Sequence, residues 1–169
     1  MGAIQMPHLF FEDINNDPFY SDFTITLWIK PYDVVNTSDI FFQLDEHNGS
    51  SWEIAYNDGL LFIGMESSGL TLQPIPNEWN FISIVWNCEL STLWIYHNGE
   101  LYDTDSNTPI SNIAGTEEFF SLLYTLPYFL LSDFRIYATA LSASDVLELY
   151  NTSMIVNSDG TISPRVLTS

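Results

Sequence analysis

The segment of residues 78–104 constrains the fold more than any other part of the chain. It contains three stretches rich in aromatic and branched residues, and the pair Asn98-Gly99 separates the second from the third. Asn-Gly is typical of a two-residue hairpin turn because both positions tolerate a positive φ. The segment therefore predicts three consecutive antiparallel strands in the middle of a sheet. These predicted strands are residues 79–87, 92–97 and 100–104.

Other stretches of the chain show the alternation of a strand. In residues 23–30, every second residue from Phe23 onward is a large apolar one that would face a core. The turn residues 57–59, with the sequence NDG, predict a second hairpin between two further stretches. The remaining predicted strands are residues 40–44, 52–56, 60–65, 70–73, 119–124 and 129–137.

One helix is predicted near the end of the chain. Ser142 can cap its first turn, Asp145 stands in the capping-box position, and Val146, Leu149 and Tyr150 share one face. Many short strands separated by turn signals are typical of an antiparallel sandwich of two packed sheets. We therefore predict an all-β, two-sheet sandwich with one short helix near the C-terminus.

A length of 169 residues suits a single domain with a core of its own. We assign residues 1–151 to this domain. Residues 152–169 form a C-terminal arm in this scheme, and Asp159-Gly160 would allow the arm to fold as a small hairpin.

The charge balance limits the partners of the chain. Three Lys and Arg residues stand against 22 Asp and Glu residues, which gives a formal net charge of −19. A chain this acidic would repel the phosphates of nucleic acids and the surface of an anionic membrane. The acidity is interpreted as a means of keeping an aromatic-rich surface soluble, with cation binding or a basic partner as the alternatives.

The sequence carries no signal for export or membrane insertion. Residues 1–5 lack the basic and apolar regions of a signal peptide, and the apolar stretches are shorter than the roughly 20 residues of a membrane span. We therefore expect a protein made without a signal peptide. The single cysteine, Cys88, has no intrachain partner for a disulfide and is interpreted as a small apolar residue.

Three stretches together resemble laminin-G-like and concanavalin A-like jelly rolls. Residues 23–31 (FTITLWIKP) resemble the opening strand of that family, and residues 78–104 resemble its central strands with the pattern W-x-x-x-x-x-x-W followed by L-x-I-Y-x-N-G. Residues 131–151 (LSDFRIYATALSASDVLELYN) are similar to its closing strand and helix. The resemblance covers residues 8–151. It implies a jelly-roll sandwich with a lectin-like or adhesive role, because members of this family mostly bind glycans or proteins.

The resemblance also bears on catalysis and argues against it. Glucanases with this fold resemble one another in an E-x-D-x-x-E strand, which places two carboxylates on one face. This pattern is absent from the sequence. The three histidines, His8, His47 and His97, lack the spacing of metal ligands, and His97 is interpreted as a solvated strand end. We expect no catalytic residues and no enzymatic activity.

Calcium is the one cofactor that the resemblance brings into question. Calcium-binding members often carry consecutive acidic residues where their closing strand begins, and this chain has Ser132-Asp133 there. Because calcium takes about six to eight oxygen ligands, Asp133 with Asp17 makes an incomplete set. We expect no cofactor, and calcium held by Asp17 and Asp133 is the alternative. A salt bridge between Asp133 and Arg135 is the other role predicted for that carboxylate.

The loop that follows residue 44 is the candidate ligand-binding site. Asp45, His47 and Asn48 would supply hydrogen-bonding groups, and Trp52 an apolar platform, which is the pairing that a sugar requires. The alternative is that the loop is merely polar. In that case Trp52 belongs with the inward-facing residues of its strand.

Three functions remain open from the sequence. The first is a non-catalytic protein on a particle surface, as a phage virion decoration or adhesion protein, in which residues 152–169 join other virion proteins by strand addition. The second is a stand-alone carbohydrate-binding module of an extracellular protein. The third, a glycoside hydrolase, is disfavoured by the missing carboxylate pattern. In the first two, the partner is a glycan or a protein surface.

Overall fold

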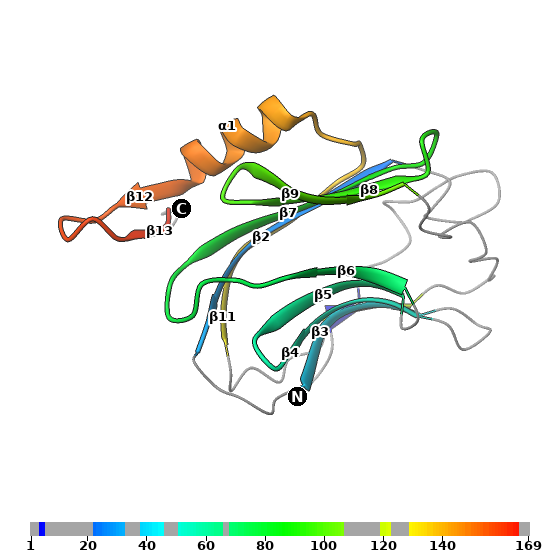
Figure 1. Cartoon of the computed structure of the whole chain (residues 1–169), viewed down its shortest axis with the longest axis horizontal. Coiled ribbons are helices and arrows are strands. Elements are labelled where there is room, and N and C mark those ends of the chain that lie inside the picture. Colours follow the sequence, from blue (N-terminus) through cyan, green and yellow to red (C-terminus); the bar gives the residue numbers. More distant parts are fainter. Residues whose placement is uncertain are drawn as a thin grey trace.

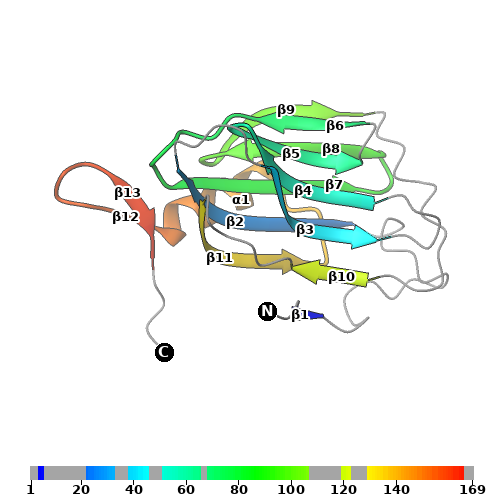
Figure 2. The same ribbon diagram turned by 90° about the horizontal axis from the view of Figure 1, so that it is seen from below.

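The structure, a computed structural model, describes residues 4–5, 22–32, 38–45, 51–65, 68–106, 119–122 and 129–165. Two antiparallel sheets face each other, one helix lies on the outer side of one sheet, and a two-stranded hairpin projects at one end (Figures 1 and 2). This arrangement confirms the predicted two-sheet jelly-roll sandwich with a short helix near the C-terminus.

The first sheet has six strands in the order β1-β10-β3-β4-β5-β6. All neighbouring strands of this sheet pair in antiparallel fashion. The turn at Asp58-Gly59 joins β4 to β5, and both residues have a positive φ. The strands are β1 (Ile4–Gln5), β3 (Ser38–Asp45), β4 (Ser51–Asn57), β5 (Leu60–Met65), β6 (Ser68–Leu72) and β10 (Phe119–Leu122).

The second sheet has five strands in the order β11-β2-β7-β8-β9. The three central strands predicted from the sequence are β7, β8 and β9, and Asn98 and Gly99 form the predicted turn with φ of 53° and 83°. The strands are β2 (Phe23–Pro31), β7 (Asn80–Asn87), β8 (Thr92–His97), β9 (Glu100–Asp105) and β11 (Phe129–Tyr137).

The main core lies between the two sheets. Phe23, Ile25, Leu27 and Ile29 of β2 are all buried in it, which confirms the alternation predicted for that strand. Buried residues of the six-stranded sheet meet them, among them Phe42, Ile54, Tyr56, Leu61 and Ile63. Burial of this apolar surface is the main force that holds the two sheets together.

A second apolar cluster lies on the outer side of the five-stranded sheet, under helix α1 (Ala143–Ser153). The helix begins with the predicted capping box of Ser142 and Asp145. Val146 is fully buried, and Leu149 and Tyr150 pack beside it as predicted. The sheet residues of this cluster are Trp28, Phe81, Val85 and Tyr96.

The chain after the helix forms an antiparallel hairpin of β12 (Met154–Val156) and β13 (Ile162–Pro164). The turn between the strands contains Gly160 at φ 83°, as the sequence predicted for Asp159-Gly160. Met154 and Ile162 pack against the cluster under α1. The division into a domain of residues 1–151 and an arm of residues 152–169 stays a prediction.

Candidate binding site

The loop predicted to bind a ligand connects β3 to β4. Asp45 is the last residue of β3 and pairs with Ser51, while Trp52 pairs with Leu44. The backbones of Asp45 and Trp52 therefore lie at the same end of the six-stranded sheet. His47 and Asn48 fall outside the described residues. The glycan-binding role of this loop stays a prediction.

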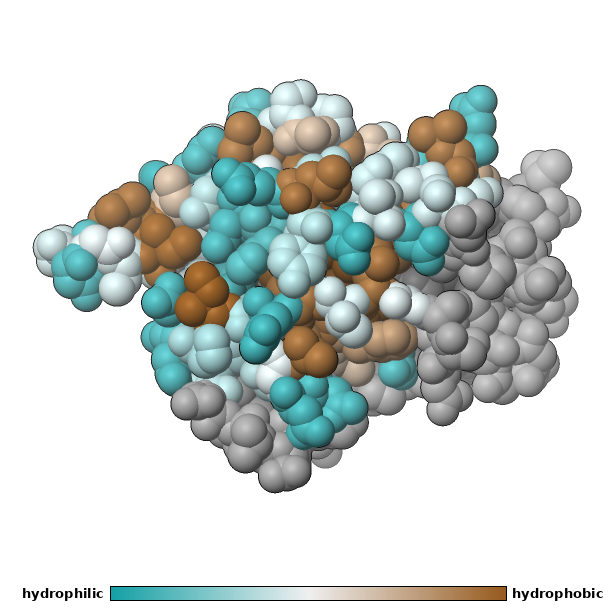
Figure 3. Space-filling model, in the orientation of Figure 1, coloured by the Kyte–Doolittle hydropathy of each residue, from teal (hydrophilic) through white to brown (hydrophobic). Residues whose placement is uncertain are grey.

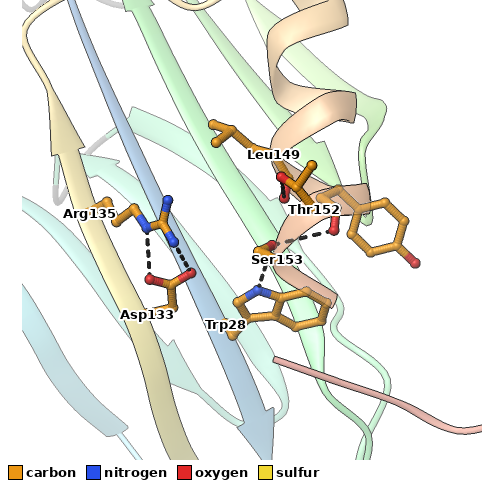
Figure 4. Close-up of polar contacts among 7 residues, drawn as sticks. Trp28, Asp133, Arg135, Leu149, Thr152 and Ser153 are labelled. Atoms are coloured by element: carbon orange, nitrogen blue, oxygen red, sulfur yellow. Dashed lines mark hydrogen bonds and ion pairs between the residues drawn. The ribbon is translucent and has the colours of Figure 1, made fainter. Parts of the chain in front are cut away.

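Asp133 and Arg135 form the predicted salt bridge at an irregular point of β11. The register between β11 and β2 shifts between Ser132 and Arg135, and Asp133 has a φ of 49°. The two carboxylate oxygens of Asp133 accept hydrogen bonds of 2.7 and 2.8 Å from Nε and Nη2 of Arg135. This bond to Asp133 is the main reason why the pKa of Arg135 is raised. Figure 4 shows the pair near Trp28.

The salt bridge bears on the calcium prediction. A cation at Asp133 would have to compete with the guanidinium group of Arg135 for both carboxylate oxygens. Asp17 lies outside the described residues. In the part of the chain that the structure describes, no group of three or more His, Cys, Asp or Glu side chains is placed to hold a metal ion. Calcium held by Asp17 and Asp133 stays a prediction.

A network of hydrogen bonds around Asn80 fixes the side chain of His97. The Oδ1 atom of Asn80 accepts the backbone N–H of Ile75 at 2.8 Å and lies 2.8 Å from Nε2 of His97. Its Nδ2 atom donates to the carbonyl oxygens of Ile75 and Glu78 at 3.0 and 2.9 Å. Asn80 is fully buried, so every polar atom of its amide is used inside the protein.

This network also decides which ring nitrogen of His97 carries the hydrogen. Because Oδ1 of Asn80 can only accept, Nε2 of His97 must donate, and Nδ1 of the neutral ring is an acceptor. Burial lowers the pKa of His97 and so favours the neutral ring. Among the described residues, Ser83 Oγ is the one buried side-chain polar atom without a hydrogen-bond partner.

His97 is the last residue of β8, as the sequence predicted, but the expectation that its side chain is simply solvated is wrong. The side chain is only partly exposed, and it is bonded to a residue 17 positions earlier in the chain. The sequence did contain a signal for this, because Leu93 and Ile95 precede His97 at alternate positions of β8 and both are fully buried. His97 continues this inward-facing row to the margin of the core.

Tyr102 lies against His97 because of a β-bulge in β9. Tyr96 pairs with Leu101 and Ile95 pairs with Asp103, so Tyr102 is an extra residue between them. Its ring meets the imidazole of His97 edge to face, with centroids 6.2 Å apart and an interplanar angle of 76°. Tyr102 is nevertheless 49% exposed. The bulge thus presents an aromatic ring to solvent beside an imidazole of fixed orientation.

Two exposed carboxylates complete this surface. Asp103 pairs with Ile95 and so belongs to the same face of the sheet as His97, while Glu100 pairs with His97 at the turn, where burial and the charge of Glu100 raise the pKa of Tyr150 in α1. We call His97, Glu100, Tyr102 and Asp103 the β9 edge site. Strand β9 ends its sheet, β6 ends the other sheet, and the two strands are in contact on the same side of the sandwich (Figure 2).

The β12–β13 hairpin offers a second exposed surface. Its strands pair only with each other among the described strands. Ile155 and Val156 are 42% and 63% exposed, and Figure 3 shows hydrophobic surface on this projecting part of the molecule. The backbone N–H of Arg165 donates to the carbonyl oxygen of Ser153 at 2.6 Å, which ties the base of the hairpin to the end of α1.

None of the described helices is long and apolar enough to span a lipid bilayer. Curated protein sequences contain no significant match to this chain.

Three solved structures illustrate the likeness of this fold to known proteins. The binding domain of botulinum neurotoxin DC, in complex with rat synaptotagmin II, is 22% identical, with a TM-score of 0.66 over 86% of this chain and 39% of that one. A structure of botulinum neurotoxin type C, whose cell entry is described as dependent upon interaction with two ganglioside molecules, is 21% identical, with a TM-score of 0.64 over 86% of this chain and 40% of that one. The binding domain of Paraclostridial Mosquitocidal Protein 1 is 22% identical, with a TM-score of 0.59 over 79% and 38%.

The chain thus spans about two fifths of the length of these structures, and the likeness is one of fold. A family model described as the concanavalin A-like lectin/glucanases superfamily matches residues 7–147. The match includes the opening strand, the central strands, the closing strand and the first turn of the closing helix, on which the resemblance in the sequence rests. The chain belongs to the concanavalin A-like lectin/glucanase superfamily.

Proposed function

We propose that the chain is a non-catalytic, lectin-like binding domain that recognises a glycan or a protein surface. The observation that carries this proposal is the β9 edge site, in which the exposed ring of Tyr102 stands beside the imidazole of His97, whose Nδ1 atom is an acceptor in the neutral ring. An apolar platform next to oriented polar groups is the usual composition of a site for a small ligand. Membership of the lectin/glucanase superfamily supports the same role.

The arrangement of the five-stranded sheet supports a role without catalysis. A glucanase needs two carboxylates facing each other across a substrate on an accessible surface. Helix α1 instead covers the outer face of this sheet, where Trp28, Phe81 and Tyr96 lie buried. Asp133, which lies beside this covered region, is engaged by Arg135. Strand β9, in contrast, is an exposed edge of this sheet, which suits the binding of a ligand.

Binding and hydrolysis can be separated in one experiment. Saturation-transfer NMR would detect the binding of oligosaccharides to the whole chain, and release of reducing ends from β-glucans would detect hydrolysis. We expect binding of a glycan without release of reducing ends. Hydrolysis at a rate that scales with protein concentration would contradict the non-catalytic role.

We further propose that the domain acts on a particle surface, as a virion decoration or adhesion protein of a phage. The β12–β13 hairpin supports this proposal, because its strand edges and the exposed Ile155 and Val156 suit strand addition to a neighbouring chain. The alternative is a stand-alone carbohydrate-binding module of an extracellular protein. The β9 edge site is compatible with both roles, the virion surface protein and the stand-alone module.

The two proposed roles, virion surface protein and stand-alone module, predict different oligomeric states in solution. A hairpin that assembles would give an oligomer by light scattering, and the double change Ile155→Thr and Val156→Thr would reduce the oligomer to a monomer. These changes keep β-branched side chains, so the hairpin itself should persist. A monomer at all concentrations, with and without the changes, would favour the stand-alone module. Truncation after residue 151 would be a poorer test, because it removes Ser153, to which Trp28 is bonded.

A further inference from the structure

We infer that the β9 edge site binds an uncharged sugar residue, with the ring of Tyr102 as its apolar platform and Nδ1 of His97 as an acceptor for one of its hydroxyl groups. This inference rests on the proposed function and assigns it a place and a class of ligand. Four features of the site carry it: the ring, the imidazole, the carboxylates and the exposed edge of the sheet.

The ring of Tyr102 is suited to the apolar face of a sugar. A sugar ring exposes C–H groups on one face and hydroxyl groups around its rim, so it binds where an aromatic surface adjoins hydrogen-bonding groups. Tyr102 is about half exposed, although it contacts His97 edge to face. The contact limits the positions of the ring, which reduces the entropy lost when a ligand binds.

His97 supplies a hydrogen-bond acceptor at a fixed place. Its Nε2–H group is committed to Oδ1 of Asn80, which leaves Nδ1 as an acceptor directed away from that bond. Asn80 is itself held by the backbone of Ile75 and Glu78. The imidazole therefore needs no rearrangement to accept a hydrogen bond from a hydroxyl group.

The two carboxylates decide the charge of the ligand. Glu100 and Asp103 are exposed and pair with His97 and Ile95, and Oδ1 of Asp103 is oriented by the backbone N–H of Thr104 at 2.8 Å. Ionised carboxylates only accept hydrogen bonds, so the site offers several acceptors to a ligand that is rich in hydroxyl donors. With a net charge of −19 on the chain, a sialylated or sulfated sugar would be repelled.

The edge of the five-stranded sheet makes the site accessible. Strand β9 has a neighbour, β8, on one side only, and five of its six residues are exposed. Leu101, next to Tyr102, pairs with Tyr96 and so belongs to the opposite face of the sheet, toward α1. Leu101 is 55% exposed on the same strand but lies outside the proposed contact with the sugar. A substitution of Leu101 is therefore a matched control for a substitution of Tyr102.

The test uses the whole chain and variants at these positions. The probes are uncharged oligosaccharides ending in galactose, glucose, mannose or N-acetylglucosamine, their sialylated and sulfated forms, and a lysine-rich peptide. Binding would be followed by NMR titration, with the signals of His97 and Tyr102 as local reporters. We expect at least one uncharged sugar to bind and to shift both signals, and the charged forms to bind more weakly.

The variants then separate the contributions. Tyr102→Ala should weaken binding about tenfold or more, as the loss of a central aromatic contact does. His97→Gln keeps a donor for Asn80 but loses the ring acceptor, and should weaken binding about threefold to tenfold. Leu101→Ala should bind as the unchanged protein does. Thermal unfolding of each variant would verify that it is folded.

The outcomes distinguish this inference from the proposed function. Sugar binding that both Tyr102→Ala and His97→Gln leave unchanged would overturn the site while the lectin-like role stands. Preferred binding of sialylated or sulfated sugars at this site would overturn the argument from charge. Binding of the lysine-rich peptide alone, lost in Tyr102→Ala, would assign the site to a basic protein partner. A chain that binds none of the sugars would overturn both the site and the glycan-binding function.

Discussion

Trp28 and Ser153, which are 125 positions apart, are joined by a hydrogen bond of 3.1 Å from the indole Nε1 to the hydroxyl oxygen (Figure 4). Trp28 is fully buried in β2, and Ser153 is the last residue of α1. The indole ring also packs against Phe81 and Tyr150, with centroid distances of 5.3 and 5.9 Å. This bond therefore fixes the end of the helix, and with it the start of the C-terminal hairpin, to the five-stranded sheet.

Removing the hydroxyl of Ser153 should destabilise the protein. In Ser153→Ala the buried N–H of Trp28 has no acceptor in place of the lost hydroxyl, and such a group costs about 1–3 kcal/mol. The free energy of unfolding, measured in urea, should fall by that amount.

Thr152→Ala is the matched control for this change. Thr152 is exposed, and its hydroxyl donates to the carbonyl oxygens of Glu148 and Leu149 within the same helix. A surface change of this kind should alter stability by less than about 0.5 kcal/mol. Equal losses in the two variants would mean that the bond to Trp28 contributes nothing measurable.

Gly99→Ala should cost more stability than Gly160→Ala. Both glycines have a φ of 83°, where a residue with a Cβ is strained by about 1–2 kcal/mol. A Cβ at Gly99 would also lie 2.9 Å from Cδ1 of Leu147 and 3.0 Å from Cδ1 of Tyr150, whereas a Cβ at Gly160 would meet nothing within 4 Å. The excess loss in Gly99→Ala, measured by urea unfolding, should report the close packing of α1 on the turn.

The regular parts of the fold could be predicted because strand geometry imposes them on the sequence. Side chains of a strand alternate between its faces, so the apolar residues at every second position from Phe23 onward predicted the buried face of β2. Strand β11 has the predicted bounds, Phe129–Tyr137, and Ser142 caps α1 as its capping box predicted.

The β9 edge site could not be predicted in the same way. The bulge that turns Tyr102 toward His97 depends on the register between β8 and β9, which no single strand sequence determines. The partner of His97 is Asn80, whose orientation is set in turn by the backbone at Ile75 and Glu78. Contacts of this kind depend on how the strands pair, which residue types do not reveal. The residue types pointed instead to the polar loop after residue 44 as the ligand-binding site.

The stability of the protein should fall as the solution becomes mildly acidic, in part because of His97. Burial lowers the pKa of His97 in the folded protein, so below about pH 6.5 the unfolded chain binds more protons than the folded one. The stabilisation is complete above the unfolded pKa of about 6.5 and is lost as the pH falls toward the lower folded pKa. His97→Gln should flatten the dependence of the unfolding free energy on pH below about pH 6.5. An unchanged slope would show that the ring titrates as it does in an unfolded chain.

Calcium should not stabilise the unchanged protein. An ion bound to the folded state at 100 times its Kd would add about 2.7 kcal/mol to the free energy of unfolding, so thermal unfolding is a sensitive test. Both oxygens of Asp133 accept hydrogen bonds from the positively charged group of Arg135, which a cation would have to displace. We therefore expect the same Tm in calcium, in magnesium and in a chelator. A rise in Tm that is specific to calcium and absent from Asp133→Asn would instead establish the alternative predicted from the sequence, in which Asp17 and Asp133 hold the ion.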